Sequence, residues 1–171
     1  AFVFSLMGLL VVMTAGNWFD QPMIANGPRG RIAFAGGLVT LGVLATQYVL
    51  GGLLRHLGSS TAWLVHPWLA VGVAVAAIGF CWAAARTGEA ELAKAGRWVL
   101  AFVVAQAALG LVTWGVKYGF PQWNVMAVQQ SSLQVAVRSL HKVLGLLTVM
   151  TTVVAIARIW RRLPARNTVA A

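Results

Sequence analysis

Apolar residues along this chain occur in long runs rather than in the alternation of a half-buried strand. A membrane-spanning helix needs about 20 mostly apolar residues to cross roughly 30 Å of hydrocarbon. Residues 1–15 match the trailing part of such a helix, so we expect position 1 to lie partway along a longer product. The stretches that qualify as complete spans are residues 32–54, 62–85, 98–116 and 143–159, the last with an amphipathic lead-in from residue 131.

The composition narrows the class of protein. The 171 residues are 60% hydrophobic and 9% charged, with a mean hydropathy of +0.80, whereas a soluble domain carries roughly 25% charged residues. These values exclude a soluble globular enzyme, and the unbroken runs argue against an outer-membrane barrel. We expect an all-α integral membrane protein: a four-helix bundle made of two helix pairs in a pseudo-repeat, plus part of one preceding transmembrane helix.

The net charge of +10 comes from basic residues that flank the apolar runs. This placement is typical of topology signals and lipid-headgroup anchors, so membrane lipid is an expected partner and nucleic acid is not. The more basic side should be cytoplasmic, in a bacterial inner membrane or its equivalent. The expected organisation is a partial transmembrane helix (1–16), a cytoplasmic linker (17–31), a four-helix membrane domain (32–162) and a cytoplasmic tail (163–171). The expected cytoplasmic basic residues are Arg29, Arg31, Arg86, Lys94, Arg97, Arg158, Arg161, Arg162 and Arg166.

A weak internal repeat aligns residues 45–53 with 104–112. Each copy contains Gln-x-x-x-Gly, with Gly51 in the first and Gly110 in the second. In each case the following helix carries a histidine near its outer end, His66 or His141. Two helix pairs of similar design suit a bundle with a site between them.

His66 and His141 are the main candidates for chemistry, because polar groups inside apolar helices are expensive and usually functional. Both should lie at similar depth near the outer face, which is what a shared ligand requires. Neutral imidazoles are good ligands for haem iron, so we expect a bis-His haem b whose metal ligands are these two residues. Small residues leave room beside the imidazoles, and three basic residues at the water boundary could pair with haem propionates. The small residues are Gly51, Gly110, Gly145 and Ala70, and the basic ones are Arg55, Arg138 and Lys142.

Other interpretations of the same residues exist. An intramembrane histidine can serve only as a helix-to-helix hydrogen-bonding group. His56, in the predicted outer turn, is a rival ligand. Hydrolytic catalysis lacks a serine in a recognisable catalytic pattern with either His66 or His141, and the three acidic residues are expected on the cytoplasmic side, away from the histidines.

Three motifs, in order, resemble the heme A synthase family of membrane enzymes. Residues 47–58 are similar to its Q-x-x-LG-x-x-x-RH-x-G segment, and residues 106–113 to its Q-x-x-LG-x-x-T segment. His141 with Gly145 is similar to its H-x-x-x-G motif. The match covers roughly residues 40–159 and is best with the C-terminal half of the family.

The resemblance implies that His66 and His141 are axial ligands of a haem b that handles electrons. Oxidation of the haem substrate in this family is placed in the other half, beside a glutamate. Pro67 stands where the family usually has Arg, an outer-loop cysteine pair is missing, and no glutamate precedes either histidine in the outer half of a helix. We therefore expect a haem-binding domain of a heme A synthase-like oxidoreductase, acting in haem A biosynthesis, cytochrome oxidase assembly and electron transfer. Its catalytic carboxylate would lie in an N-terminal half. The alternative is a non-catalytic haem-binding or structural membrane subunit of a respiratory or photosynthetic complex.

Overall fold

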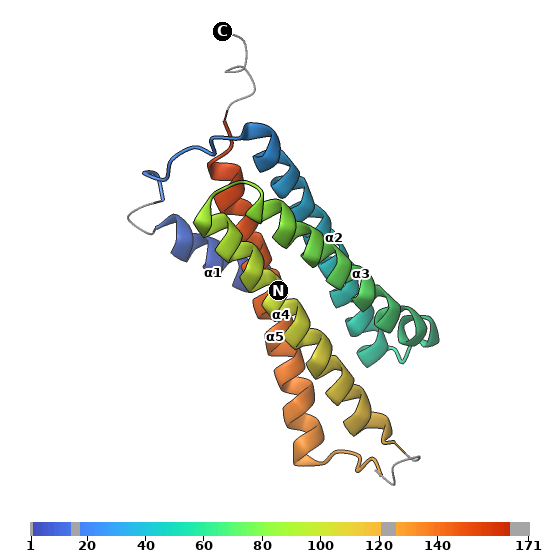
Figure 1. Ribbon diagram of the computed structural model, residues 1–171. Coiled ribbons are helices and arrows are strands. Elements are labelled where there is room, and N and C mark those ends of the chain that lie inside the picture. The colour runs from blue at the N-terminus through green and yellow to red at the C-terminus, as the bar shows by residue number, and fades with distance from the viewer. Residues whose placement is uncertain (1, 15–17, 121–125, 165–171) are drawn as a thin grey trace.

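The structure is a computed structural model that describes residues 2–14, 18–120 and 126–164 (Figure 1). Over these ranges the regular elements are all helices. They are α1 (Phe2–Met13), α2 (Gly27–His56), α3 (Ser60–Ala85), α4 (Ala90–Tyr118) and α5 (Ser132–Arg161).

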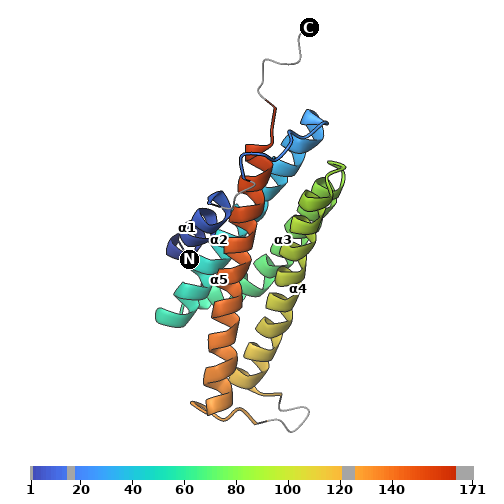
Figure 2. The ribbon, with the colours of Figure 1, turned by 90° about the vertical axis from the view of Figure 1, so that its left-hand side faces the viewer.

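Helices α2 to α5 run alternately up and down, so that consecutive helices are antiparallel neighbours (Figures 1 and 2). Helix α2 also packs against α5, which closes a four-helix bundle, while α1 lies outside the bundle against α5. Each of α2 to α5 is long and apolar enough to cross a membrane. The predicted all-α membrane bundle, preceded by a further apolar helix, is confirmed.

The bundle has two chemically different ends. The end that we call the basic end holds the start of α2, the α3–α4 connection and the end of α5. The opposite end, called the histidine end, holds the α2–α3 and α4–α5 connections, and the α4–α5 hairpin projects further there than the α2–α3 hairpin (Figures 1 and 2).

Two helices begin earlier than the apolar pattern predicts. Helix α2 starts at Gly27 because Asn26 Oδ1 accepts a hydrogen bond from Arg29 N (3.1 Å) and Pro28 occupies the first turn. Helix α4 starts at Ala90 rather than at residue 98, since its first two turns consist of alanine, leucine, lysine and glutamate, which are strong helix formers. The basic residues expected in the 17–31 and 86–97 connections therefore lie partly on helices. Residues 165–171 of the predicted tail lie outside the described residues.

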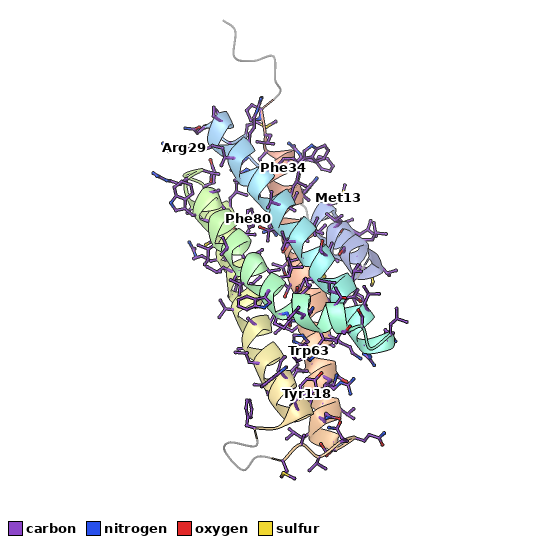
Figure 3. All side chains as sticks on the ribbon, turned by 90° about the vertical axis from the view of Figure 1, so that its right-hand side faces the viewer. Met13, Arg29, Phe34, Trp63, Phe80 and Tyr118 are labelled. Carbon is purple, nitrogen blue, oxygen red and sulfur yellow. The ribbon has the colours of Figure 1, made fainter. Side chains whose placement is uncertain are left out.

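The apolar core fills only part of the bundle. One buried cluster around Phe80 occupies the basic half, with Phe34 packed against it, and a second cluster around Leu44 lies further along the bundle (Figure 3). Among the described residues from 45 to 72 and from 104 to 147, Ala62 is the one buried apolar side chain. The histidine end thus lacks the packed apolar core that holds the other half together.

Helices α3 and α4 approach closely at Gly96. A Cβ added there would lie 3.1 Å from both Ala84 Cβ and Cys81 Cα. Backbone atoms of a packed helix do not yield easily to such a contact. Small residues at membrane helix interfaces commonly permit this kind of approach.

Replacing Gly96 with leucine should therefore lower the free energy of unfolding in detergent by about 1–3 kcal/mol, because the new side chain overpacks the α3–α4 interface. The matched control is Gly42→Leu, since a Cβ at Gly42 meets nothing within 4 Å. Denaturation followed by far-UV circular dichroism measures both variants. Equal stability of the two would contradict the close packing.

A buried arginine joins three segments at the basic end. The Arg162 side chain is 5% exposed and forms an ion pair with Glu89 of the α3–α4 connection. Its Nε donates to Pro22 O at 2.7 Å, and its backbone carbonyl accepts from Ile24 N at 2.9 Å. The sequence analysis counted Arg162 among the topology signals at the membrane surface, but the structure places it inside the protein, where it fastens the segment before α2 to the end of α5.

Candidate functional site: paired histidines at one end of the bundle

The two candidate histidines lie on different hairpins. His66 is in the second turn of α3 and His141 in the third turn of α5, and both are half-buried. The α4–α5 hairpin projects further than the α2–α3 hairpin (Figure 2), and His141 lies one turn further into its helix than His66 does.

Each histidine is held by a glutamine from the other helix of its own hairpin. Gln47 Nε2 on α2 donates to the backbone carbonyl of His66 at 2.9 Å and lies 3.4 Å from its ring Nε2. Gln106 Nε2 on α4 donates to the carbonyl of His141 at 2.9 Å and lies 3.5 Å from its ring Nε2. The weak sequence repeat therefore corresponds to one geometry built twice.

The glycine of each repeat lies against the imidazole. A Cβ added at Gly51 would be 3.3 Å from His66 Cε1, and one added at Gly110 would be 3.3 Å from His141 Cε1. These distances are tighter than ordinary van der Waals contact, so a larger side chain would displace the ring. Gly51 and Gly110 clear space for the histidines, as expected from the sequence.

Gly145 has a different neighbour from the one expected. A Cβ there would meet Gln106 Nε2 at 3.0 Å and Gln106 Cδ at 3.7 Å, and it meets no imidazole atom within 4 Å. Gly145 therefore makes room for the amide that holds His141 rather than for the ring itself. Its counterpart in the other pair is Ala70, which follows His66 by one turn.

The paired sites contain buried polar atoms without partners. Among the described residues, Nδ1 of both His66 and His141 and Oε1 of both Gln47 and Gln106 are buried and make no hydrogen bond. Such an atom costs about 1–3 kcal/mol when left unsatisfied. Four of them, at an end of the bundle that lacks an apolar core, indicate a place built around something besides these side chains.

The donor set suits a metal. A neutral imidazole carries one N–H and one lone pair. In both His66 and His141, ring Nδ1 makes no hydrogen bond among the described residues, and ring Nε2 has only the long contact with the glutamine amide. The lone pair is therefore weakly engaged on either nitrogen. Two imidazole lone pairs, one from each hairpin, are what a bis-His haem iron requires. Groups of three or more His, Cys, Asp or Glu that could hold a metal ion do not occur among residues 2–14, 18–120 and 126–164.

The basic residues proposed for this site divide by orientation. Arg138 is partly buried and lies three residues before His141, on the same side of α5. Arg55 is exposed in the last turn of α2, four residues beyond Gly51. Lys142 is exposed and follows His141 directly, so it points to another side of the helix. Arg55 and Arg138 are thus the better placed pair.

His56, the rival ligand, is the last residue of α2 and is exposed. It lies nine residues, more than two turns, beyond Gln47, whereas His66 meets Gln47 directly. The structure brings each of His66 and His141 together with its own glutamine and leaves His56 at the surface.

Aromatic rings join the two hairpins beside the histidines. Trp63 of α3 meets Tyr118 of α4 edge to face, with ring centroids 6.5 Å apart (Figure 3). Trp114 packs against Tyr118 at 5.8 Å, and Lys117 Nζ lies 4.9 Å from the centre of the Tyr118 ring. This cluster fixes α3 against α4 where the apolar core has ended.

The two glutamines belong to the sequence repeat, but the repeat alone predicts no role for them. The signal was present in the spacing, because residues four apart share one side of a helix. Gln47 and Gly51 therefore face the same neighbour, as do Gln106 and Gly110. No protein-family model, no curated protein and no solved structure matches the chain, so the interpretation of this site rests on its own residues.

Proposed function

We propose that the chain is a membrane domain that holds one b-type haem between its two hairpins, with His66 and His141 as axial ligands. The observation that carries the proposal is the duplicated arrangement in which each hairpin presents a half-buried imidazole with an unpartnered ring nitrogen. A haem bound there supplies one-electron transfer.

The chain's own residues have distinct tasks in this proposal. Gln47 and Gln106 fix the histidine-bearing turns by bonding their carbonyls, which keeps the imidazoles oriented before any ligand arrives. Gly51 and Gly110 leave the rings unobstructed. Arg55 and Arg138 supply positive charge at the water boundary, where haem propionates would lie.

The sidedness follows from the charge distribution. Most lysines and arginines belong to the basic end, which we assign to the cytoplasm. The haem site would then lie near the outer face, with the C-terminus cytoplasmic.

The three motifs similar to heme A synthase favour an oxidoreductase domain in haem A biosynthesis and cytochrome oxidase assembly. Under this proposal the present residues bind haem and pass electrons. Oxidation of the substrate would use a carboxylate in an N-terminal half. We accordingly name no catalytic residue in this chain.

A second candidate is a non-catalytic haem-binding or structural subunit of a respiratory or photosynthetic complex. The position of the acidic residues favours it: Asp20 precedes α2, and Glu89 and Glu91 flank the start of α4, all at the end opposite the histidines. A fall in cellular haem A after gene deletion supports the oxidoreductase. Unchanged haem A, with co-purification of a larger complex, supports the subunit.

The haem itself is tested on the purified chain in detergent. We expect a reduced-minus-oxidised absorption spectrum of six-coordinate low-spin haem b, at about one haem per chain. A colourless preparation of folded protein, unchanged by added haemin, would contradict the proposal.

A further inference from the structure

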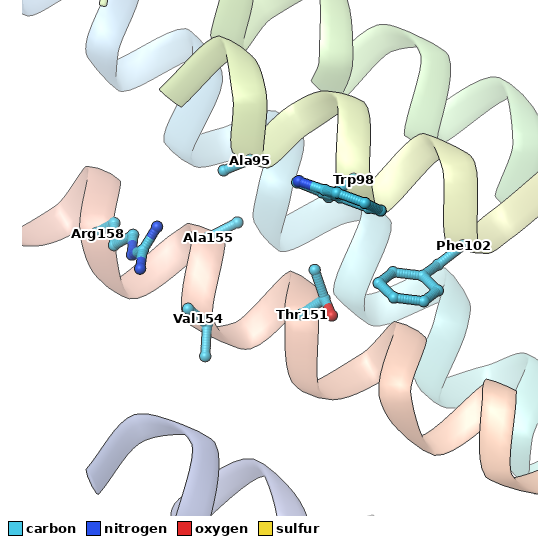
Figure 4. Close-up of a pocket in the computed structure, with 7 residues that line it drawn as sticks. All are labelled: Ala95, Trp98, Phe102, Thr151, Val154, Ala155 and Arg158. Atoms are coloured by element: carbon cyan, nitrogen blue, oxygen red, sulfur yellow. The ribbon is translucent and has the colours of Figure 1, made fainter. Parts of the chain in front are cut away.

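A groove runs between α4 and α5 near the basic end, far from the histidines (Figure 4). Its volume is about 330 Å³. Trp98 and Phe102 form the α4 wall, with ring centroids 6.0 Å apart. On the α5 side the groove is lined by Thr151, Val154, Ala155 and Arg158.

Helix α1 packs against α5 beside the groove. A Cβ added at Gly8 would touch Met150 and would lie 3.5 Å from Val154 Cγ2, and Val154 also lines the groove. The ribbon of α1 passes along the other side of α5 in Figure 4. The groove therefore lies between α4 and α5, and α1 lies on the other side of α5 (Figure 4).

The groove carries its positive charge at one end only, while the hydroxyl of Thr151 lies toward the Phe102 end (Figure 4). Arg158 lies at the end nearer the end of α5, and the indole nitrogen of Trp98 is at the end of its ring nearer Arg158 (Figure 4). Phe102 occupies the opposite end. A second hollow of about 320 Å³ adjoins the first and is lined by Lys94, Arg97 and Trp98. Neither hollow is lined by an acidic residue. Glu91 lies one helical turn before Ala95 and is not part of either lining.

Arg158 differs from its neighbours in having no partner. Arg161 donates to Phe19 O at 2.7 Å and Arg162 pairs with Glu89. Arg158 is partly buried, yet it makes no hydrogen bond or ion pair with any residue that the structure describes. Its guanidinium nitrogens are not sealed inside the protein, so they are accessible to a ligand in the groove, and their planar fork is well shaped for a phosphate.

We infer that this groove binds an anionic phospholipid, with an acyl chain along Phe102, Val154 and Ala155 and the phosphate at Arg158. Basic pockets between helices at the charged end of a membrane protein suit such headgroups. Trp98 belongs at the headgroup level, where its ring is apolar and its N–H is a donor. Lys94 and Arg97 add the positive charge that selects an anionic headgroup over a zwitterionic one. The inference is independent of the haem proposal.

The test is lipid binding to the full chain in detergent, measured by native mass spectrometry with phosphatidylglycerol or phosphatidylcholine of identical acyl chains. We expect wild-type protein to retain phosphatidylglycerol preferentially. Arg158→Gln should weaken this retention about fivefold or more, and Arg158→Lys should largely keep it.

The matched control is Arg31→Gln, which removes the same charge at the same end, from an exposed site outside the groove. Its retention of phosphatidylglycerol should stay within a factor of two of wild type. Helical content by circular dichroism checks that each variant is folded. Equal losses in Arg158→Gln and Arg31→Gln, or equal retention of both lipids by wild type, would overturn the inference.

Discussion

Replacing His141 with alanine should abolish the six-coordinate low-spin haem spectrum of the purified chain. His66→Ala should do the same, because a bis-His iron loses one of its two axial ligands in either variant. The loss is expected to be essentially complete rather than graded, since the described residues contain no group of three or more His, Cys, Asp or Glu from which a substitute ligand could come. Absorption spectra at fixed protein concentration measure the result.

The structure supplies a matched control for this experiment in His56. This residue is exposed at the end of α2, so His56→Ala should leave the spectrum unchanged. Loss of the spectrum in His56→Ala, with retention in His66→Ala, would show that the rival histidine is the ligand.

Substitutions at two neighbouring glycines test whether the position of the His66 ring matters, with the histidine itself left in place. A side chain at Gly51 would meet the His66 ring, whereas one at adjacent Gly52 meets nothing within 4 Å. Gly51→Leu should therefore weaken or shift the low-spin spectrum, and Gly52→Leu should not. Identical behaviour of these two variants would argue against an iron ligand at His66.

The second large effect is expected at the opposite end of the bundle, where Arg162→Met should destabilise the protein by about 2–4 kcal/mol. Removing one member of a buried ion pair leaves the other charge uncompensated. Glu89 is 26% exposed, so solvent screens part of that cost. The substitution also removes the hydrogen bond from Arg162 Nε to Pro22 O, which fastens the segment before α2. Denaturant titration in mixed micelles, followed by circular dichroism, measures the loss.

A double-mutant cycle identifies the source of this effect. Glu89→Gln alone should cost less than Arg162→Met, because the glutamine oxygen can still accept from the guanidinium and the bond from Arg162 Nε to Pro22 O is kept. The double variant should lose less unfolding free energy than the two single variants lose in sum, since the two residues interact directly. The control Arg31→Met, at an exposed position, should change stability by less than about 0.5 kcal/mol. Strict additivity at residues 89 and 162 would contradict the ion pair.

Much of the candidate site was accessible from the sequence because it is duplicated. Gln-x-x-x-Gly followed by a helix with one histidine occurs twice, and the structure builds the two copies alike. Gly145 was placed beside the wrong group, because helical spacing says which side a residue faces but not which partner side chain fills the space. The haem proposal was first reached from the pattern of residues, and it stays a prediction.

The number, order and approximate span of the helices were determined by the sequence alone, because hydrocarbon thickness imposes a minimum length on each apolar run. Because each connection joins two spans at the same side of the membrane, consecutive helices must be antiparallel. Those constraints act along the chain, so they can be recognised without coordinates.

Tertiary structure decided which polar groups meet. Arg162 looks in the sequence like any other flanking base, yet it contacts a glutamate 73 residues earlier in the chain. Likewise, Arg158 and Arg161 differ by three positions but only one of them finds a partner among the described residues. Whether a charge is solvated, paired or left available depends on distances between segments remote in sequence, and these exist only once the helices have packed.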